Sequence, residues 1–281
     1  MAREKVYRKL IQFAEMKKYW QVYLSAIQDA FADRARLAVY VLQDFIAPLV
    51  SILLWIGVYR FSGKTASGWE LDRLISYYLM VAFLSLTLNH YIEFSIGFRD
   101  IKLGGLVKYL VKPVSYLGYV FAGSNGWKTV RFLFALLPYS LLIMFFKQYF
   151  NVSASLPSVA SAALFAAIAY LMIFFYKFLL GISSFWVVEN YGLVNFFWMI
   201  QTLLSGLLIP IDFFPNWIKT VTWFLPFRFF YYLPVKLIIE RQGLGDYLPD
   251  LGVAVIWVIL LGWISASLYR KGLKNFSDTR Q

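Results

Sequence analysis

Six long runs of apolar side chains, separated by polar and basic segments, dominate the pattern of this chain. A helix needs about 20 residues to cross a hydrocarbon core of roughly 30 Å, and each run meets or nearly meets that length. Lipid offers no partner to a free backbone amide, and the runs do not alternate as barrel strands do. The chain is therefore predicted to be an all-α membrane protein, a single domain over 1–281 with six transmembrane helices. The predicted spans are Val39–Tyr59, Leu74–Gly97, Trp127–Phe146, Val159–Val187, Leu193–Ile211 and Leu251–Tyr269.

Residues 1–36 precede the first run and have a different pattern. Apolar and aromatic residues recur at helical spacing, and basic residues occupy the opposite side. This pattern predicts an amphipathic helix lying in the membrane interface, with an amphipathic helix in water as the alternative. The first strong apolar run begins near Val39, too late for a signal peptide, whose apolar core falls within about the first 15–30 residues.

A basic segment, 98–117, joins the second run to the third. Four cations oppose one acid in it, and a Gly–Gly pair precedes a short amphipathic turn that Pro113 ends. A loop that only joined two spans could be short and polar, so we interpret the segment as a surface helix that docks to a partner in the aqueous phase. The residues expected to form this docking surface are Phe98, Arg99, Asp100, Ile101, Lys102, Gly104, Gly105, Leu106, Tyr109, Lys112 and Pro113.

A second unusual segment, 212–240, lies between the fifth and sixth runs. It is apolar enough to imitate a span, but three prolines interrupt it, and Lys219, Arg228 and Lys236 would each be costly at mid-bilayer. We predict two short helices, roughly Pro215–Leu225 and Phe227–Glu240, that re-enter the outer leaflet and cap a pathway. An aromatic belt without a gating role is the alternative.

The distribution of Lys and Arg predicts the orientation of the chain. With the N-terminus inside, the cytoplasmic segments 1–38, 98–126 and 270–281 carry sixteen of these residues. The outer segments carry eight. Both termini are therefore predicted to be cytoplasmic.

Composition agrees with a membrane protein, since 60% of the residues are hydrophobic and only 15% are charged. The formal net charge is +12, but the basic residues fall between apolar runs rather than on one face. We therefore expect the basic residues to contact the membrane surface rather than nucleic acid. The chain has no cysteine, which excludes disulfides and thiolate metal sites.

The sequence carries no recognisable catalytic or metal-binding pattern. Its one histidine, His90, excludes a His-based metal cluster, and Gly63–Lys64–Thr65 lacks the first glycine of a phosphate-binding loop. Polar residues within the runs are candidates for a pathway or vestibule. These candidates are Asp44, Asn89, His90, Glu93 and Lys177.

Two interpretations of these polar residues stay open. His90 and Glu93 are three residues apart, which places them on one helix face and would suit a proton-coupled carrier. Alternatively, Asp44 and Glu93 pair with Lys128, Arg131 or Lys177 and have a structural role.

Nearly the whole chain resembles the membrane subunit of type-2 ABC exporters. The resemblance rests on the N-terminal interfacial helix, the insert Phe98–Ile101 with Gly104 and Lys112–Pro113, and the ordered motifs of the outer segment. The family's outer gate commonly reads Gly-x-x-x-Pro, then Phe-Pro, then Leu-Pro-Phe. The matching gate region comprises Gly206, Pro210, Phe213, Phe214, Pro215, Trp217, Leu225, Pro226 and Phe227.

The resemblance implies a permease that forms half of a pathway in the bacterial inner membrane. Segment 98–117 would then be the coupling helix, seated in a separate ATPase present in two copies, which would bind ATP and Mg. The chain itself would hold no cofactor and would not be an enzyme, and a second permease, identical or similar, would complete the pathway. The alternatives are an ion-coupled carrier, for which no convincing internal repeat is visible, and a membrane anchor or scaffold.

Overall fold

The computed structural model describes residues 2–62, 68–112, 114–187 and 189–278, with side chains from residue 16 onward except those of 62, 275, 277 and 278. These residues are mostly helical, and they include no strand. Pro113 and the Gly63–Lys64–Thr65 string lie outside the described residues. The α-helices are α1 (Ala2–Ala32), α2 (Arg34–Ser62), α3 (Leu71–Leu88), α4 (Val107–Leu110), α5 (Tyr116–Phe145), α6 (Leu156–Ile182), α7 (Asn190–Leu204), α8 (Asn216–Phe224), α9 (Tyr232–Ile239) and α10 (Leu248–Asp278).

Shorter helical segments join these helices. A π-helical segment, η1 (Ser95–Lys102), follows α3 and contains five of the eleven residues of the predicted docking surface. The remaining short segments are 3-10 helices, namely η2 (Lys147–Tyr149), η3 (Ser183–Phe185), η4 (Ile211–Phe213), η5 (Pro226–Phe229) and η6 (Leu244–Tyr247).

Five helices among the described residues are long and apolar enough to cross a membrane: α2, α3, α5, α6 and the helix that contains α10. The fifth predicted span, Leu193–Ile211, does not form one such helix. Helix α7 has 15 residues, about 22 Å at a rise of ~1.5 Å per residue. It ends because Gly206 adopts a φ of 80°, and the Tyr77 hydroxyl donates a 2.6 Å hydrogen bond to the Gly206 carbonyl.

Two other predicted boundaries differ from the structure. The second span, predicted to reach Gly97, ends at Leu88, because residues 89–92 leave the helix before η1 begins. The third span begins at Tyr116 rather than Trp127. The Ser115 hydroxyl caps this start of the helix by accepting a hydrogen bond from the Gly118 amide. The connection between these two spans therefore covers residues 89–115 instead of the predicted 98–126.

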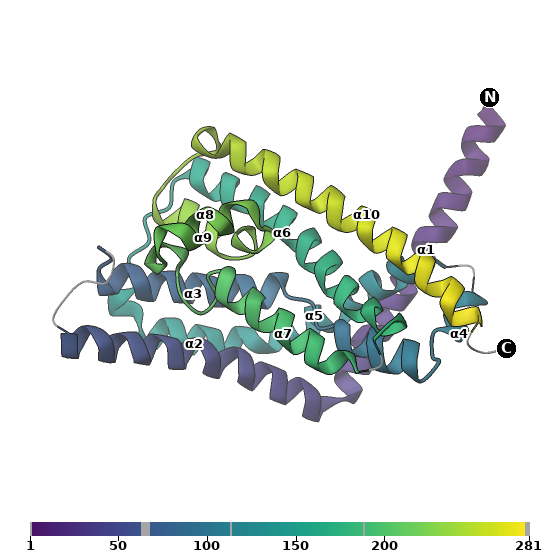
Figure 1. Ribbon diagram of the computed structural model, residues 1–281, viewed down its shortest axis with the longest axis horizontal. Coiled ribbons are helices and arrows are strands. Elements are labelled where there is room, and N and C mark those ends of the chain that lie inside the picture. The colour runs from purple at the N-terminus through teal and green to yellow at the C-terminus, as the bar shows by residue number, and fades with distance from the viewer. Residues whose placement is uncertain (1, 63–67, 113, 188, 279–281) are drawn as a thin grey trace.

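The long helices lie side by side, and α1 crosses one end of the bundle (Figure 1). Helix α1 packs on α5 through small residues, since a Cβ on Gly118 would lie 2.8 Å from the Tyr19 ring and one on Gly126 would overlap the backbone of Tyr23. Tyr23 also donates a 3.0 Å hydrogen bond to the Thr129 hydroxyl. These close contacts leave little freedom for α1 to slide along α5.

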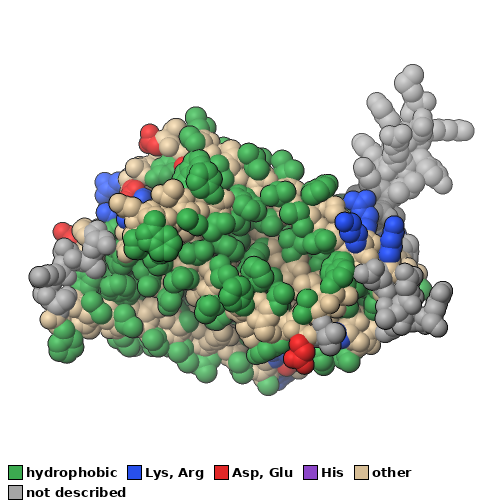
Figure 2. Space-filling model, viewed as in Figure 1, with side chains coloured by type: hydrophobic (Ala, Val, Ile, Leu, Met, Phe, Trp, Pro, Cys, Tyr) green, Lys and Arg blue, Asp and Glu red, His purple; other side chains and the backbone are tan. Residues whose placement is uncertain are grey.

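Segments that are predicted to lie on the same side of the membrane meet at the same end of the bundle. At the end where α1 lies, the Tyr19 hydroxyl accepts from the Ser115 amide, and the Tyr116 ring stacks on Tyr269. At the other end, Arg73 forms an ion pair with Glu240. The flanks between the ends are rich in hydrophobic side chains, while Lys and Arg gather near the ends (Figure 2). This distribution is the one expected of an integral membrane protein.

Candidate functional site

The predicted docking segment begins with η1, which is pressed against the junction of α6 and α7. A Cβ on Gly97 would lie 2.5 Å from Ser184 Oγ, and a Cβ on Gly181 would lie 2.7 Å from Ile96 Cβ. Only glycine therefore allows η1 to approach this junction so closely. The segment is tied to the helices rather than extended into water.

The paired glycines end the π-helical segment with a tight turn. Gly104 has a φ of 75°, a left-handed conformation that favours glycine. A Cβ on Gly105 would lie 2.8 Å from the carbonyl oxygen of Arg99. The Leu106 amide donates a 2.7 Å hydrogen bond to the Asp100 carbonyl, which closes the turn. A left-handed backbone and a close approach thus explain why two adjacent glycines occur here.

Asp100 does not lie on the surface where the sequence places it. Its side chain is only 2% exposed, and its carboxylate accepts hydrogen bonds from the Tyr116 hydroxyl at 2.7 Å and from Arg99 Nε at 3.1 Å. Asp100 therefore joins the segment to α5 instead of facing a partner. Arg99, the partner of Asp100 in this ion pair, has a half-exposed side chain and remains accessible to solvent.

The apolar side chains of the segment divide into a buried and an exposed group. Ile101, Leu106 and Tyr109 are buried in a core that this segment shares with α5, α6 and the end of α10. The prediction that Leu106 and Tyr109 belong to the docking surface therefore does not agree with the structure, because their own chain covers them. Five other apolar side chains are exposed, and they are Phe98, Leu103, Val107, Leu110 and Val111. Lys102, Lys108 and Lys112 are exposed beside them, and we call these eight residues the docking face.

The predicted vestibule residues are distributed over separate ion pairs. Asp44 of α2 pairs with Arg131 of α5. Glu93 pairs with Lys177 of α6 at 2.8 Å, and both side chains are buried. His90 and Glu93 do not share a helix face, because residues 89–92 are not helical. His90 instead lies 3.0 Å from Lys128 Nζ and 3.2 Å from Ser124 Oγ.

Asn89 lies at the end of α3, and its side-chain oxygen is buried without a hydrogen-bond partner among the described residues. The sequence indicates Lys128 and Arg131 only as possible partners of Asp44 and Glu93. The structure adds both to the group of functional candidates, since they line the same cavity as Asn89 and His90.

The predicted outer gate contains two short helices over nearly the expected ranges, α8 and η5–α9. Gly206 and Pro210 are buried in the turn after α7, where a Cβ on Gly206 would overlap the Tyr77 hydroxyl. Phe213 packs edge-on against Trp55 and Trp69.

The remaining gate residues differ widely in burial. Pro226 and Phe227 are buried, Phe214 and Leu225 are partly buried, and Pro215 and Trp217 are exposed. The aromatic residues therefore belong partly to the core and partly to the surface, rather than to a single belt.

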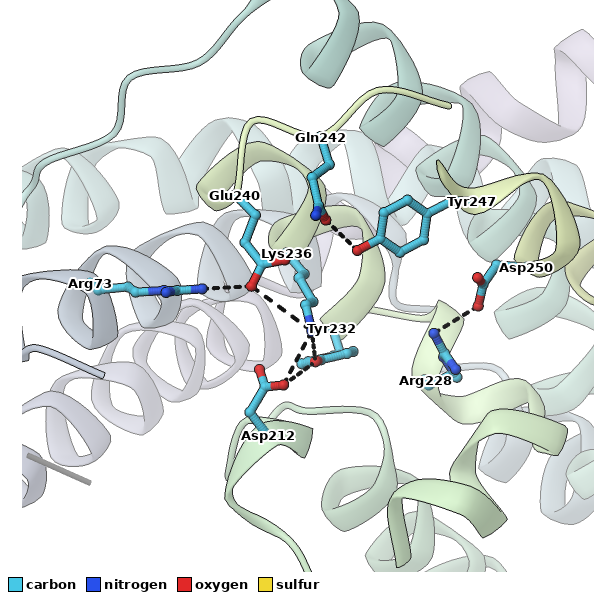
Figure 3. A network of polar contacts seen from close by, with 9 residues as sticks. All are labelled: Arg73, Asp212, Arg228, Tyr232, Lys236, Glu240, Gln242, Tyr247 and Asp250. Carbon is cyan, nitrogen blue, oxygen red and sulfur yellow. Dashed lines mark hydrogen bonds and ion pairs between the residues drawn. The ribbon is translucent and has the colours of Figure 1, made fainter. Parts of the chain in front are cut away.

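A polar network that the sequence did not predict joins this outer segment to α3 and α10 (Figure 3). Lys236 contacts Asp212 at 3.2 Å and lies 3.9 Å from Glu240, which pairs with Arg73 at 2.7 Å. Arg228 pairs with Asp250 at 2.7 Å. The spacing of Tyr232, Lys236 and Glu240 along one helix face is the only sequence signal that could have indicated it.

Tyr232 completes the centre of this network. Its hydroxyl donates a 2.8 Å hydrogen bond to Asp212 and accepts one from Lys236 Nζ at 2.8 Å. Burial, together with the neighbouring Asp212 carboxylate, raises the pKa of Tyr232 above that of free tyrosine. The phenol therefore stays protonated and keeps donating to Asp212.

A family described as ABC-2 family transporter protein matches residues 45–279. The match covers most of the chain, from within the first span onward, and includes the docking face and the outer segment. No curated protein matches the chain.

Proposed function

Because the chain belongs to the ABC-2 transporter family, we propose that it is the permease subunit of an ATP-driven exporter and forms half of its pathway. Members of this family are transport subunits and do not carry out catalysis. The residues described here fit that role, since they form helices long and apolar enough to span a membrane. The short α7 and the turn at Gly206 would together complete a sixth crossing.

The docking face is the observation that best supports coupling to a separate ATPase. Val111 is 79% exposed and Leu103 is 66% exposed, although the distribution of Lys and Arg predicts that this segment lies in the cytoplasm rather than in lipid. Exposed apolar side chains rimmed by lysines in an aqueous segment are typical of a surface that a protein partner covers. The core beneath the face contacts α5, α6 and α10, so that a force on the face would reach three helices.

The partners follow from this proposal. Two copies of the ATPase would bind ATP and Mg, and the permease would bind neither. A second permease, identical or similar, would supply the other half of the pathway. The cytoplasmic ends of the helices and both termini would face the ATPases, and the membrane would be the bacterial inner membrane.

The proton-coupled alternative finds no support in the arrangement of His90 and Glu93. Glu93 is bound to Lys177, and His90 is bound to Lys128 and Ser124, so that no continuous path joins the two side chains among the described contacts. Each group has a structural partner, as expected of a buried polar residue.

Cross-linking in the cysteine-free chain tests the proposal. A Val111→Cys variant, purified from its native membrane after treatment with a cross-linker, should carry an ATPase that lacks membrane spans. Leu137→Cys is the matched control, because Leu137 is also an exposed apolar residue but lies within the span α5. Absence of any ATPase from both the cross-linked and the untreated preparations would exclude the proposed function.

A further inference from the structure

A cavity of about 310 Å³ lies at the inner end of the bundle, among α1, α2, the break after α3, η1, α4 and α5. Its volume falls at the lower end of the roughly 300–1,000 Å³ typical of small-molecule sites. The docking segment contributes Arg99, Lys108 and Tyr109 to its wall. The cavity is therefore shared between the membrane spans and the segment proposed to contact the ATPase.

Aromatic rings form much of the cavity wall. Tyr40 and Tyr91 stack on each other with ring centroids 5.6 Å apart, and Tyr109, Tyr119 and Trp127 also line the cavity. Such surfaces pack well against flat apolar or aromatic groups. The wall thus favours a ligand with an aromatic or otherwise flat apolar body.

Positive charge is in excess in this cavity, since its wall includes five Lys and Arg side chains against the two carboxylates of Asp29 and Asp100. Arg36, Arg99 and Arg131 each have a carboxylate partner, and these partners are Asp33, Asp100 and Asp44. Lys128, which is half-buried, differs from them. Among the ion pairs of the described residues, none gives Lys128 a carboxylate. Its ammonium lies 4.0 Å from the centre of the Tyr170 ring and contacts His90.

The contacts of His90 indicate how Lys128 is held. Ser124 Oγ donates to the Phe121 carbonyl, so that it can accept a hydrogen bond from His90 Nδ1. His90 Nε2 then carries no hydrogen and accepts from Lys128 Nζ at 3.0 Å. A neutral imidazole and an aromatic face orient the ammonium, but neither supplies a negative charge.

We propose that this cavity binds an organic anion that has an aromatic or flat apolar body, with its acidic group at Lys128. The anion supplies the counter-charge that no ion pair of the described residues gives to Lys128, and the tyrosine and tryptophan rings enclose the apolar body. The buried Asn89 oxygen can accept from a donor group of the ligand, since it has no partner within the chain. That such an anion is the cargo of the exporter rests on the proposed function, whereas its binding does not.

Binding of two matched probes to the purified full chain in zwitterionic lipid nanodiscs tests this inference. The probes are 1-naphthalenesulfonate, an aromatic anion, and 1-naphthalenemethanol, a neutral compound with the same ring. Wild type should bind the sulfonate about tenfold more tightly than the alcohol, a difference of about 1.4 kcal/mol, because only the sulfonate offers a negative charge to Lys128. Lys128→Met should abolish this preference, and Lys128→Arg should retain it.

The alcohol also reports on folding, because an intact cavity in Lys128→Met should still bind it with the affinity of wild type. Lys219→Met is the matched control, since Lys219 lines a different cavity at the outer end of the bundle. Its preference for the sulfonate should equal that of wild type. Equal affinity of wild type for the two probes, binding of neither, or an unchanged preference in Lys128→Met would each overturn the inference. Because no ATPase is present, failure to find a partner ATPase would leave this result unaffected.

Discussion

The Tyr116 hydroxyl donates a 2.7 Å hydrogen bond to the carboxylate of Asp100. Tyr116 begins α5, and Asp100 lies in η1. This bond therefore connects the docking segment to the first turn of a membrane span. It is buried, so that water cannot easily replace either partner.

Tyr116→Phe tests the importance of this bond. Loss of the hydroxyl leaves a buried carboxylate with Arg99 as its remaining partner, which should lower stability by about 1–3 kcal/mol. Thermal unfolding of the purified chain in detergent measures the change. Tyr191→Phe is the control, because the Tyr191 side chain is exposed, and it should unfold at the wild-type temperature. An unchanged melting temperature of Tyr116→Phe would show that the bond does not contribute.

Substitution at the paired glycines should disrupt the turn that presents the docking face. Gly104→Ala places a side chain at a φ of 75°, a left-handed conformation that costs about 1–2 kcal/mol. Gly105→Ala brings a methyl group 2.8 Å from the Arg99 carbonyl oxygen. Both variants should reduce the yield of the ATPase cross-link from Val111→Cys.

Gly192→Ala is the matched control for the glycine variants. Gly192 lies in α7, and no atom approaches within 4 Å of the position its Cβ would take. Alanine should be neutral or stabilise the helix by up to about 1 kcal/mol, with an unchanged cross-link. If all three variants gave the same cross-link yield, the turn would not determine the position of the docking face.

The buried pair of Glu93 and Lys177 should show strong coupling. Glu93→Gln leaves the ammonium of Lys177 without its counter-charge, and removal of one partner of a buried pair typically costs about 3–5 kcal/mol. The double variant Glu93→Gln/Lys177→Met removes both charges and should recover most of that loss. Thermal unfolding of both single variants and the double variant measures the coupling. Additive effects of the two substitutions would show that the pair acts as two independent groups.

The cysteine-free background allows the membrane topology to be mapped with single cysteines. We expect Ser153→Cys, between η2 and α6, to react with an impermeant maleimide in intact cells. Lys112→Cys and Lys271→Cys should react only after the membrane is opened. Each of these positions is exposed in the structure, so that burial does not explain a lack of reaction. Labelling of residue 271 from outside would require an odd number of crossings.

Helix boundaries were predictable where proline or glycine marks them. The outer helix predicted at Pro215–Leu225 is observed as α8, Asn216–Phe224, because prolines stand at both of its ends. The end of α7 and the break at 89–92 were not predictable in the same way. The turn after α7 depends on Tyr77 and Tyr232, which lie far from it in sequence.

At the candidate site, too, some features were predictable from the sequence and others were not. The need for glycine at 104 and 105 follows from local geometry, and the structure shows the physical reason at both positions. An amphipathic pattern, however, does not reveal whether the same chain or another chain covers its apolar side. This ambiguity explains why the sequence predicts Leu106 and Tyr109 on the docking surface, although their own chain buries them.

The close packing of α1 on α5 has a mechanical consequence. Helix α1 is about 47 Å long at a rise of ~1.5 Å per residue, and the glycine contacts attach its C-terminal half to α5. If α5 tilts during a transport cycle, α1 must sweep through the lipid headgroups with it. The elastic resistance of the bilayer would then enter the work of each cycle, so that lipid packing and membrane curvature would set part of the turnover rate.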